Sequence, residues 1–416
     1  NRFSERTNRD SMKKMAILNR KNLLIAVFTL ATLSVEAQNS IIISGQDVDR
    51  RVITTAVPFL NFAPDSRHSG MGDVGVALSP DASSAHWNAG QLAFVENDMG
   101  FSLSYSPWLG KLVNDMSLSY LTGFFKIDEV SAFGFDLRYF DMGDIQLTDG
   151  NGEDLGQFNP RDIAIGGTYS RKLSSYLGLG ISARFIYSNL SGNISSVGGS
   201  EAKPGISVGT DVGLYYSKPI FAGAKDANFS WGVSILNIGP KITYNSADDL
   251  DYIPTNLKVG TAYSIDLDQV NKLTFALDLN KLLVPSPPIY STNEDGTLET
   301  DSNGNLIIKP GNGKDPNRPL LSGMFGSFTD APGGFSEEMQ EIMISFGVEY
   351  SYDDKFAVRT GYFHENQSKG GRKYFTMGVG FDLKKLGFDF SYLVPQKQNH
   401  PLAETLRFTL MYNITK

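Results

Sequence analysis

The chain has 416 residues, of which 41% are hydrophobic and 12% aromatic, and it contains no cysteine. The lack of cysteine excludes disulfide bonds and thiol chemistry. Its 45 acidic residues outnumber its 37 basic ones, which gives a formal net charge of -8. This balance argues against nucleic acid as a partner, because phosphate binding depends on clustered Lys and Arg.

Residues 1-37 have the pattern of a secretory signal peptide preceded by a few upstream residues. Basic residues from Lys13 to Lys21 precede the apolar run "NLLIAVFTLATLSV", and small residues at Val35 and Ala37 suit cleavage after Ala37. A short membrane anchor is the alternative, but the run is brief and no stop-transfer flank follows it. We therefore expect export through a signal peptide.

From residue 98 onward, apolar and polar side chains alternate. In the last segment, Leu406, Phe408 and Leu410 share one face. Arg407 and Thr409 share the other, because successive side chains of a strand point to opposite faces. The alternation predicts about fourteen strands, near 98-106, 115-125, 130-140, 161-170, 176-187, 205-217, 228-237, 256-266, 271-280, 341-352, 355-363, 372-382, 386-394 and 404-416.

The pattern favours an all-β fold, a transmembrane antiparallel β-barrel of about 14 strands over residues 98-416. Connections after even strands are short and those after odd strands long, an asymmetry typical of outer-membrane barrels. A soluble β-sandwich would also alternate, but its outer face should be polar, and here the aromatic face continues from strand to strand. The sheet must close in lipid, so "LRFTLMYNITK" is expected to pair with the first strand near "GFSLSYS".

Two further sets of side chains follow from the barrel hypothesis. Aromatic residues near strand ends are interpreted as an interface girdle; they are Trp108, Tyr169, Tyr187 and Trp231. Charges of both signs fall on the luminal face, where pairing with each other or with a plug is a commoner arrangement than an ion path. They are Asp136, Arg138, Arg184, Asp211, Lys258, Asp278, Glu349, Arg359, Asp389 and Arg407.

Residues 38-97 are predicted to form an N-terminal hatch or plug, since a fourteen-stranded lumen is wider than side chains can fill. The stretch "SRHSGMGDVGVALSPDASSAHWNAGQLAF" resembles the hatch of the FadL-like outer-membrane family. That family has a proline after the asparagine, whereas Ala89 follows here, which argues against the hatch-gated uptake route of its fatty-acid importers. The matching hatch residues are Ser66, Arg67, Gly70, Gly72, Asp81, Trp87 and Asn88.

Within that superfamily, residues 38-416 resemble the PorV (LptO) family of the type IX secretion system. The resemblance implies a non-enzymatic protein of the Gram-negative outer membrane, surrounded by lipid or lipopolysaccharide. It also implies binding of cargo C-terminal signal domains at the translocon barrel and their delivery to the cell-surface sortase and attachment complex. Two alternatives stay open: a FadL-like importer of hydrophobic small molecules, and an enzyme related to lipid A deacylation.

Catalytic and metal-binding patterns are weak. "SSAH" at 83-86 is the nearest approach to a nucleophile and base, but adjacency in sequence is not triad geometry. The loop sequence from Asp301 has Asn312 where an EF-hand needs Glu, so its Asn-Gly and Asp-Gly pairs are interpreted as turns of a hairpin with arms "TLET" and "NLIIK". None of the histidines falls on a predicted strand: His68, His86, His364 and His400. We predict no enzyme, no cofactor and no metal site.

The long extracellular loop 281-340 is the predicted partner-binding region. Its segment "LLSGMFGSFTDAPGGFSEEMQ" places apolar side chains among glycines and prolines outside any predicted strand, and exposed apolar clusters commonly mark protein contacts. The alternative is that this segment folds back and caps the barrel. The candidate contact residues are Leu320, Leu321, Met324, Phe325, Phe328 and Phe335.

Overall fold

The computed structural model describes residues 42–43, 46–47, 50–110, 115–148, 154–190, 203–244, 250–396 and 405–414. The predicted signal peptide, residues 1-37, lies outside them. The chain divides into two compact units, Asn1–Ile42 and Ile43–Lys416, and the second contains the barrel together with residues 50–98. Among the described residues, no helix is long and apolar enough to cross a membrane.

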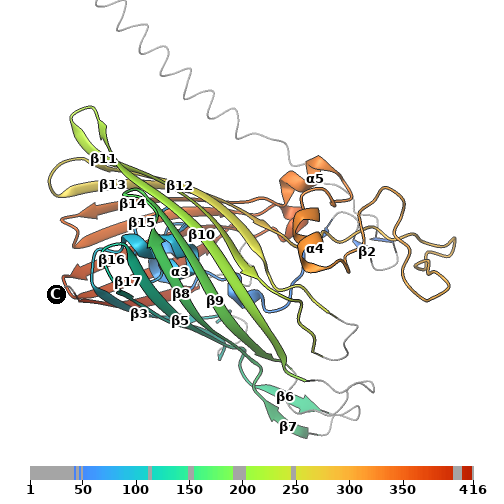
Figure 1. Ribbon diagram of the computed structural model, residues 1–416. Coiled ribbons are helices and arrows are strands. Elements are labelled where there is room, and N and C mark those ends of the chain that lie inside the picture. The colour runs from blue at the N-terminus through green and yellow to red at the C-terminus, as the bar shows by residue number, and fades with distance from the viewer. Residues whose placement is uncertain are drawn as a thin grey trace, which may run out of the picture. The chain divides into compact units, whose positions relative to one another are not determined.

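A closed antiparallel β-barrel forms the second unit, and within the described residues it has fourteen strands, which confirms the predicted fold class (Figure 1). Each strand pairs with its neighbours around the ring. The strands are β3 (Met99–Pro107), β4 (Ser117–Lys126), β5 (Ser131–Asp141), β8 (Arg161–Lys172), β9 (Leu177–Asn189), β10 (Gly205–Ala222), β11 (Lys225–Ile238), β12 (Asn256–Asp266), β13 (Asn271–Leu282), β14 (Met343–Tyr352), β15 (Phe356–His364), β16 (Lys373–Leu383), β17 (Leu386–Pro395) and β18 (Leu406–Ile414).

The last strand closes the ring against the first. β18 pairs with β3 in a register that sets Phe408 opposite Tyr105 and Leu410 opposite Leu103. Phe408, Leu410 and Tyr105 are exposed on the outer face, whereas the intervening Thr409 is buried. Closure satisfies the backbone donors and acceptors that an open edge would leave unpaired in lipid. The predicted closing strand and its apolar outer face are both confirmed.

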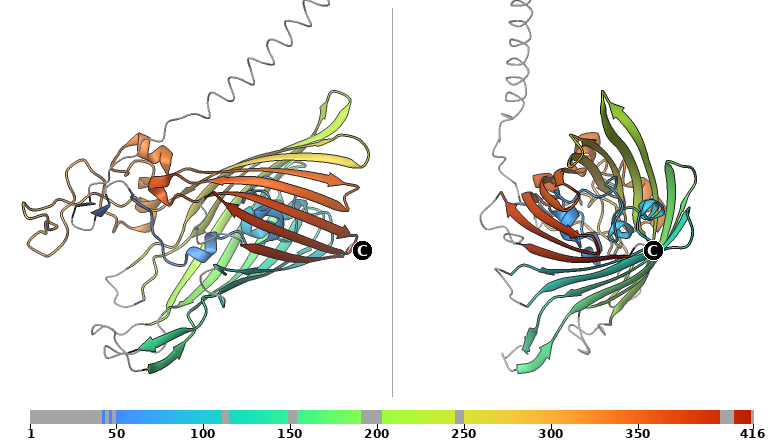
Figure 2. Two further views of the ribbon diagram at one scale, coloured as in Figure 1. Left: turned by 180° about the vertical axis from the view of Figure 1, so that it is seen from behind. Right: turned by 90° about the vertical axis from the view of Figure 1, so that its left-hand side faces the viewer.

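Residues 58–94 pack inside the barrel as a series of short helices joined by turns (Figure 2). Asp65 caps one of them by accepting a hydrogen bond from His68 N, and Asn88 caps another by accepting one from Gly90 N. These caps help to explain how helices of four and six residues form in a segment rich in glycine. The helices are η1 (Pro58–Asn61), α2 (Ser66–Ser69), α3 (Ser84–Trp87) and η2 (Ala89–Phe94).

The remaining elements lie outside the barrel wall. A hairpin of β6 (Ile145–Thr148) and β7 (Asp154–Phe158) follows β5, and the connection from β13 to β14 contains α4 (Leu320–Gly326) and α5 (Phe335–Gln340). Short strands β1 (Ile42–Ile43) and β2 (Gln46–Asp47) precede the helices of the lumen, and η3 (Gln367–Lys369) follows β15. The arms predicted as a hairpin, "TLET" and "NLIIK", form only isolated bridges, including one between Thr300 and Leu306.

Two side-chain predictions at strand ends are wrong. Trp108 is not an interface residue: it is buried, and its ring stacks on Phe62 with a centroid separation of 4.3 Å. β3 ends at Pro107, so the chain has already left the outer wall when it reaches the indole. His364 is the last residue of β15 rather than a loop residue. His400 lies outside the described residues.

Candidate functional site: the filled lumen and the long-loop surface

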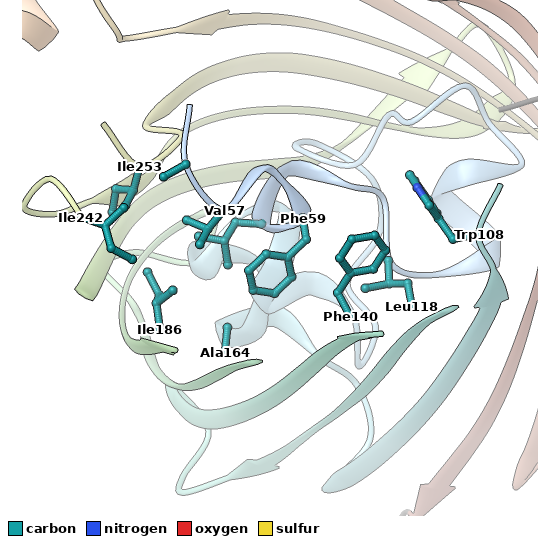
Figure 3. Close-up of a cluster of buried hydrophobic side chains, with 11 residues drawn as sticks. Val57, Phe59, Trp108, Leu118, Phe140, Ala164, Ile186, Ile242 and Ile253 are labelled. Carbon is teal, nitrogen blue, oxygen red and sulfur yellow. The ribbon is translucent and has the colours of Figure 1, made fainter. Parts of the chain in front are cut away.

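An apolar layer fills the lumen at the long-loop end. Val57, Phe59 and Leu60 of the N-terminal segment pack against Phe140 and Ile186 of the barrel wall (Figure 3). The Phe59 and Phe140 rings are stacked with centroids 6.3 Å apart. Because this layer removes apolar side chains of both segment and wall from water, it holds the segment in place.

Asp65 joins α2 to α3. Its Oδ1 lies 2.7 Å from His68 Nδ1, and its Oδ2 accepts a hydrogen bond of 2.9 Å from Trp87 Nε1. Burial opposes ionisation of this carboxyl, but the adjacent histidine lowers the pKa of Asp65 to about 2. Burial also opposes protonation of His68, yet the carboxylate raises the pKa of His68. Below that raised pKa the two residues form a buried ion pair.

The predicted hatch residues of α2 and the following turn contact the barrel wall. Ser66 N donates a hydrogen bond of 2.9 Å to Thr409 Oγ1. Gly72 N donates one of 2.8 Å to Thr376 Oγ1, and Gly72 has a φ of +76°, where glycine is favoured. A Cβ on Gly70 would lie 3.1 Å from a Cα of the facing strand, so this position allows close approach of two backbones.

Asn88 and Asp278 attach the centre of the segment to the wall. Asn88 Nδ2 donates to Leu214 O at 2.9 Å and to Val76 O at 3.0 Å. Asp278 Oδ2 accepts from Gly75 N at 2.7 Å and from Val76 N at 3.0 Å. The wall therefore supplies partners for backbone groups that the segment cannot satisfy by itself.

Arg67 and Asp81, also predicted hatch residues, belong to an ionic chain that reaches the wall. Arg67 Nη1 lies 2.9 Å from Asp81 Oδ2, and Arg67 Nε lies 3.5 Å from Glu349 Oε2. Arg359 continues the chain, with Nε 2.6 Å from Glu349 Oε2 and Nη1 2.5 Å from Asp389 Oδ1. All ten luminal charges named above are buried, in keeping with their assignment to the inner face.

Glycines on the inner face of the strands leave room for the N-terminal segment in the lumen. A Cβ built on Gly180 of β9 would overlap Ala89, and one built on Gly361 of β15 would overlap Met71. Neither overlap can be relieved by a side chain alone, because the atoms met include backbone. Glycines on the inner face of the strands are thus a requirement of the filled lumen.

α4 and α5 carry the residues predicted to bind partners. Phe325 and Phe335 are 73% and 77% exposed, and Leu321 and Phe328 are also exposed. Leu320 is half-buried, and Met324 is buried beneath the helix, where it supports the surface rather than forming part of it. We call the four exposed side chains, Leu321, Phe325, Phe328 and Phe335, the α4–α5 surface.

Buried ion pairs fix α5 and its C-cap residue Glu341 to the barrel rim. Lys281 Nζ, at the end of β13, lies 2.9 Å from Glu338 Oε2 and 2.5 Å from Glu341 Oε2. Lys369 Nζ lies 2.8 Å from Glu341 Oε1 and 2.5 Å from Glu337 Oε1. No motif in the sequence indicates these residues. The loop therefore does pack on the rim, as its alternative interpretation expected, while its apolar side chains face outward.

Next to Glu341, the residue that follows α5, a cavity of about 380 Å³ opens at the long-loop end. Its lining combines apolar residues of the N-terminal segment, such as Ile53 and Phe62, with charged residues of the rim. Lys369 and Arg372 contribute to that rim, and Arg372 Nε donates a hydrogen bond of 2.9 Å to Glu365 Oε2. The cavity and the α4–α5 surface lie at the same end of the barrel.

The described residues provide little for catalysis. They contain no group of three or more side chains able to hold a metal ion. In the "SSAH" stretch, His86 Nδ1 accepts a hydrogen bond of 2.7 Å from Arg138 Nη2. Burial, with Arg138 adding to it, lowers the pKa of His86 well below its usual value. The guanidinium of Arg138 therefore occupies the Nδ1 atom of His86. The absence of enzymatic activity stays a prediction.

A closed barrel with an apolar outer face and a segment packed in its lumen is an outer-membrane β-barrel protein. Residues 45–289, more than half of the chain, match the family of type IX secretion system protein PorV, and the chain belongs to this family. The family identified from the hatch and strand pattern is thereby confirmed. The matched region ends before α4.

Solved structures with a similar course of the chain have low sequence identity. The toluene transporter TbuX of Ralstonia pickettii is 13% identical over 85% of this chain and 98% of its own, with a TM-score of 0.44. The toluene transporter TodX of Pseudomonas putida is 10% identical over 84% and 97%, with a TM-score of 0.44. A FadL homologue of Pseudomonas aeruginosa is 12% identical over 88% and 99%, with a TM-score of 0.40. Likenesses at this level leave the function of this chain open. No curated protein matches it.

Proposed function

We propose that this outer-membrane component of type IX secretion binds the C-terminal signal domain of secreted cargo at the translocon barrel. It then delivers the cargo to the cell-surface sortase and attachment complex. In this proposal residues 1-37 direct export, residues 38-97 act as the plug, and the outer face of the strands contacts lipid or lipopolysaccharide.

The α4–α5 surface carries the proposal. Four apolar side chains of this loop are exposed, and α5, which bears Phe335, is fixed to the rim by Lys281 and Lys369. Buried ion pairs with one partner removed are strongly destabilising, so an intact network holds the loop in one arrangement. A rigid apolar surface binds a protein without the entropy cost of ordering a mobile loop.

The filled lumen favours protein binding over import of small apolar molecules. Phe59, Leu60 and their neighbours occupy the long-loop end of the lumen, and Asp65, Asn88 and Asp278 hold the segment below them. A small molecule crossing the barrel would have to displace both layers. A partner bound at the rim displaces neither.

The double substitution Phe325→Asp and Phe328→Asp tests the proposal. Apolar anchors dominate interface energies, so we expect capture of purified cargo signal domain and translocon to weaken by about tenfold or more. Leu306→Asp, an exposed position in the same loop but outside α4, is the matched control. Assembly is checked by the shift between unheated and heated gels. If the double variant assembles and captures both partners as well as the parent, the α4–α5 surface is not the binding surface.

A further inference from the structure

The hairpin of β10 and β11 extends past its neighbours at the short-turn end of the barrel (Figure 1). β9 pairs with β10 only as far as Tyr216, and β12 pairs with β11 only from Ala227. The β10–β11 pairing continues to Ala222 and Lys225 at the tip. The residues of the tip therefore project beyond the closed sheet.

Phe221 stands on the inner side of this projecting tip. It is 81% exposed, more than any other large apolar side chain of the described residues. It lies opposite Asp226 in the hairpin, and both residues line the hollow that the barrel wall encloses at this end. An exposed aromatic residue on the outer face would contact lipid, whereas one on the inner side does not.

That hollow is a vestibule of about 740 Å³ between the strand ends and the N-terminal segment. Acidic side chains outnumber basic ones among its lining residues by eight to four. Arg67 and Arg359 are already paired with carboxylates, and Lys272 lies 3.5 Å from Asp354. Asp389 on the floor is 4% exposed, and its Oδ2 has no hydrogen-bond partner within the described part of the chain. A cleft with this excess of negative charge attracts cations.

We propose that the vestibule binds a basic peptide segment of a periplasmic protein, with an apolar side chain of that segment resting against Phe221. Short turns of bacterial outer-membrane barrels face the periplasm, so the vestibule opens to that compartment. Addition of the peptide as a further strand is disfavoured, because Pro219 removes a backbone donor from the projecting edge. Recognition therefore depends on charge and on the aromatic contact. This site lies at the opposite end from the α4–α5 surface and does not rest on the function proposed for it.

The test is direct titration of the full-length protein in non-ionic detergent with a labelled lysine-rich peptide that contains one leucine. We expect saturable binding that weakens as salt is added. The same peptide with glutamate in place of lysine should not bind. Phe221→Ala should lower the affinity about tenfold or more, as loss of an aromatic anchor does, and Asp226→Lys should lower it further at low salt.

Matched controls lie in neighbouring turns outside the vestibule: Leu173→Ala for the apolar contact and Glu129→Lys for the charge. Both should bind the lysine peptide as the parent does. Equal binding of the two peptides, no binding by the parent, or equal losses in test and control variants would overturn the proposal. Because the α4–α5 variants are read out with cargo and translocon, failure here leaves that result unaffected.

Discussion

Removal of the Glu341 side chain should detach the long loop from the barrel rim. Glu341 Oε2 lies 2.5 Å from Lys281 Nζ, and its Oε1 accepts from Lys369 Nζ at 2.8 Å and from Ser286 Oγ at 2.6 Å. Breaking a buried ion pair by removing one partner costs about 3 to 5 kcal/mol. Both lysines keep a second carboxylate, so the lower figure applies to Glu341→Ala. About 3 kcal/mol corresponds to a more than hundredfold rise in the opening equilibrium of the loop.

Hydrogen exchange measured on peptides from residues 283–342 reports this opening. We expect faster exchange in the loop of Glu341→Ala, with the barrel strands protected as in the parent. Glu294→Ala, an exposed position in the same loop, should exchange like the parent. Unchanged protection of α4 and α5 in the Glu341 variant would show that the ion pairs neither hold the loop nor make the α4–α5 surface rigid.

Two further predictions concern the barrel and its plug. Truncation before Leu406 should abolish the gel shift on heating, because both neighbouring strands lose their ladder partners; a truncated chain that still shows the shift would contradict closure by β18. The raised pKa of His68 contributes stability that is full below about 6.5, the unfolded value, and is lost as pH rises through the folded pKa. The protection of α2 relative to the intrinsic exchange rate at each pH should therefore fall above the folded pKa in the parent but not in His68→Gln. The lowered pKa of Asp65, about 2, adds stability that is present above about 4 and is lost only as pH falls toward 2.

The strands could be predicted because two different surroundings act on the two faces of each strand. Lipid selects Phe408 and Leu410 on one side of β18, and the packed lumen selects Arg407 and Thr409 on the other. Each of the fourteen predicted segments overlaps one barrel strand. The hatch residues are identified by family resemblance, and most of them contact the wall in the structure. Asp81 and Trp87 instead form side-chain hydrogen bonds with Arg67 and Asp65 within the segment.

Other features depend on contacts between segments far apart in the sequence. Glu338 and Glu341 are three residues apart, a spacing that places both on one side of a helical turn, but their partner Lys281 is more than fifty residues earlier. Burial of Trp108 depends on Phe62 of the plug. The predicted strand 205-217 stopped short of Phe221, because alternation does not reveal whether a neighbouring strand continues. These contacts can be identified only from the three-dimensional structure.

The filled lumen also makes passage through the barrel costlier than binding at either of its ends. Opening a path would break the bonds that Asn88 and Asp278 make with Leu214 and with the backbone at Val76, and each buried polar group left unpaired costs about 1 to 3 kcal/mol. Several such groups together approach the whole stability of a typical domain. Passage through the lumen is therefore far more costly than binding at either end. In the two proposals above, the partners on the two sides of the membrane bind surfaces that are separated by the packed N-terminal segment.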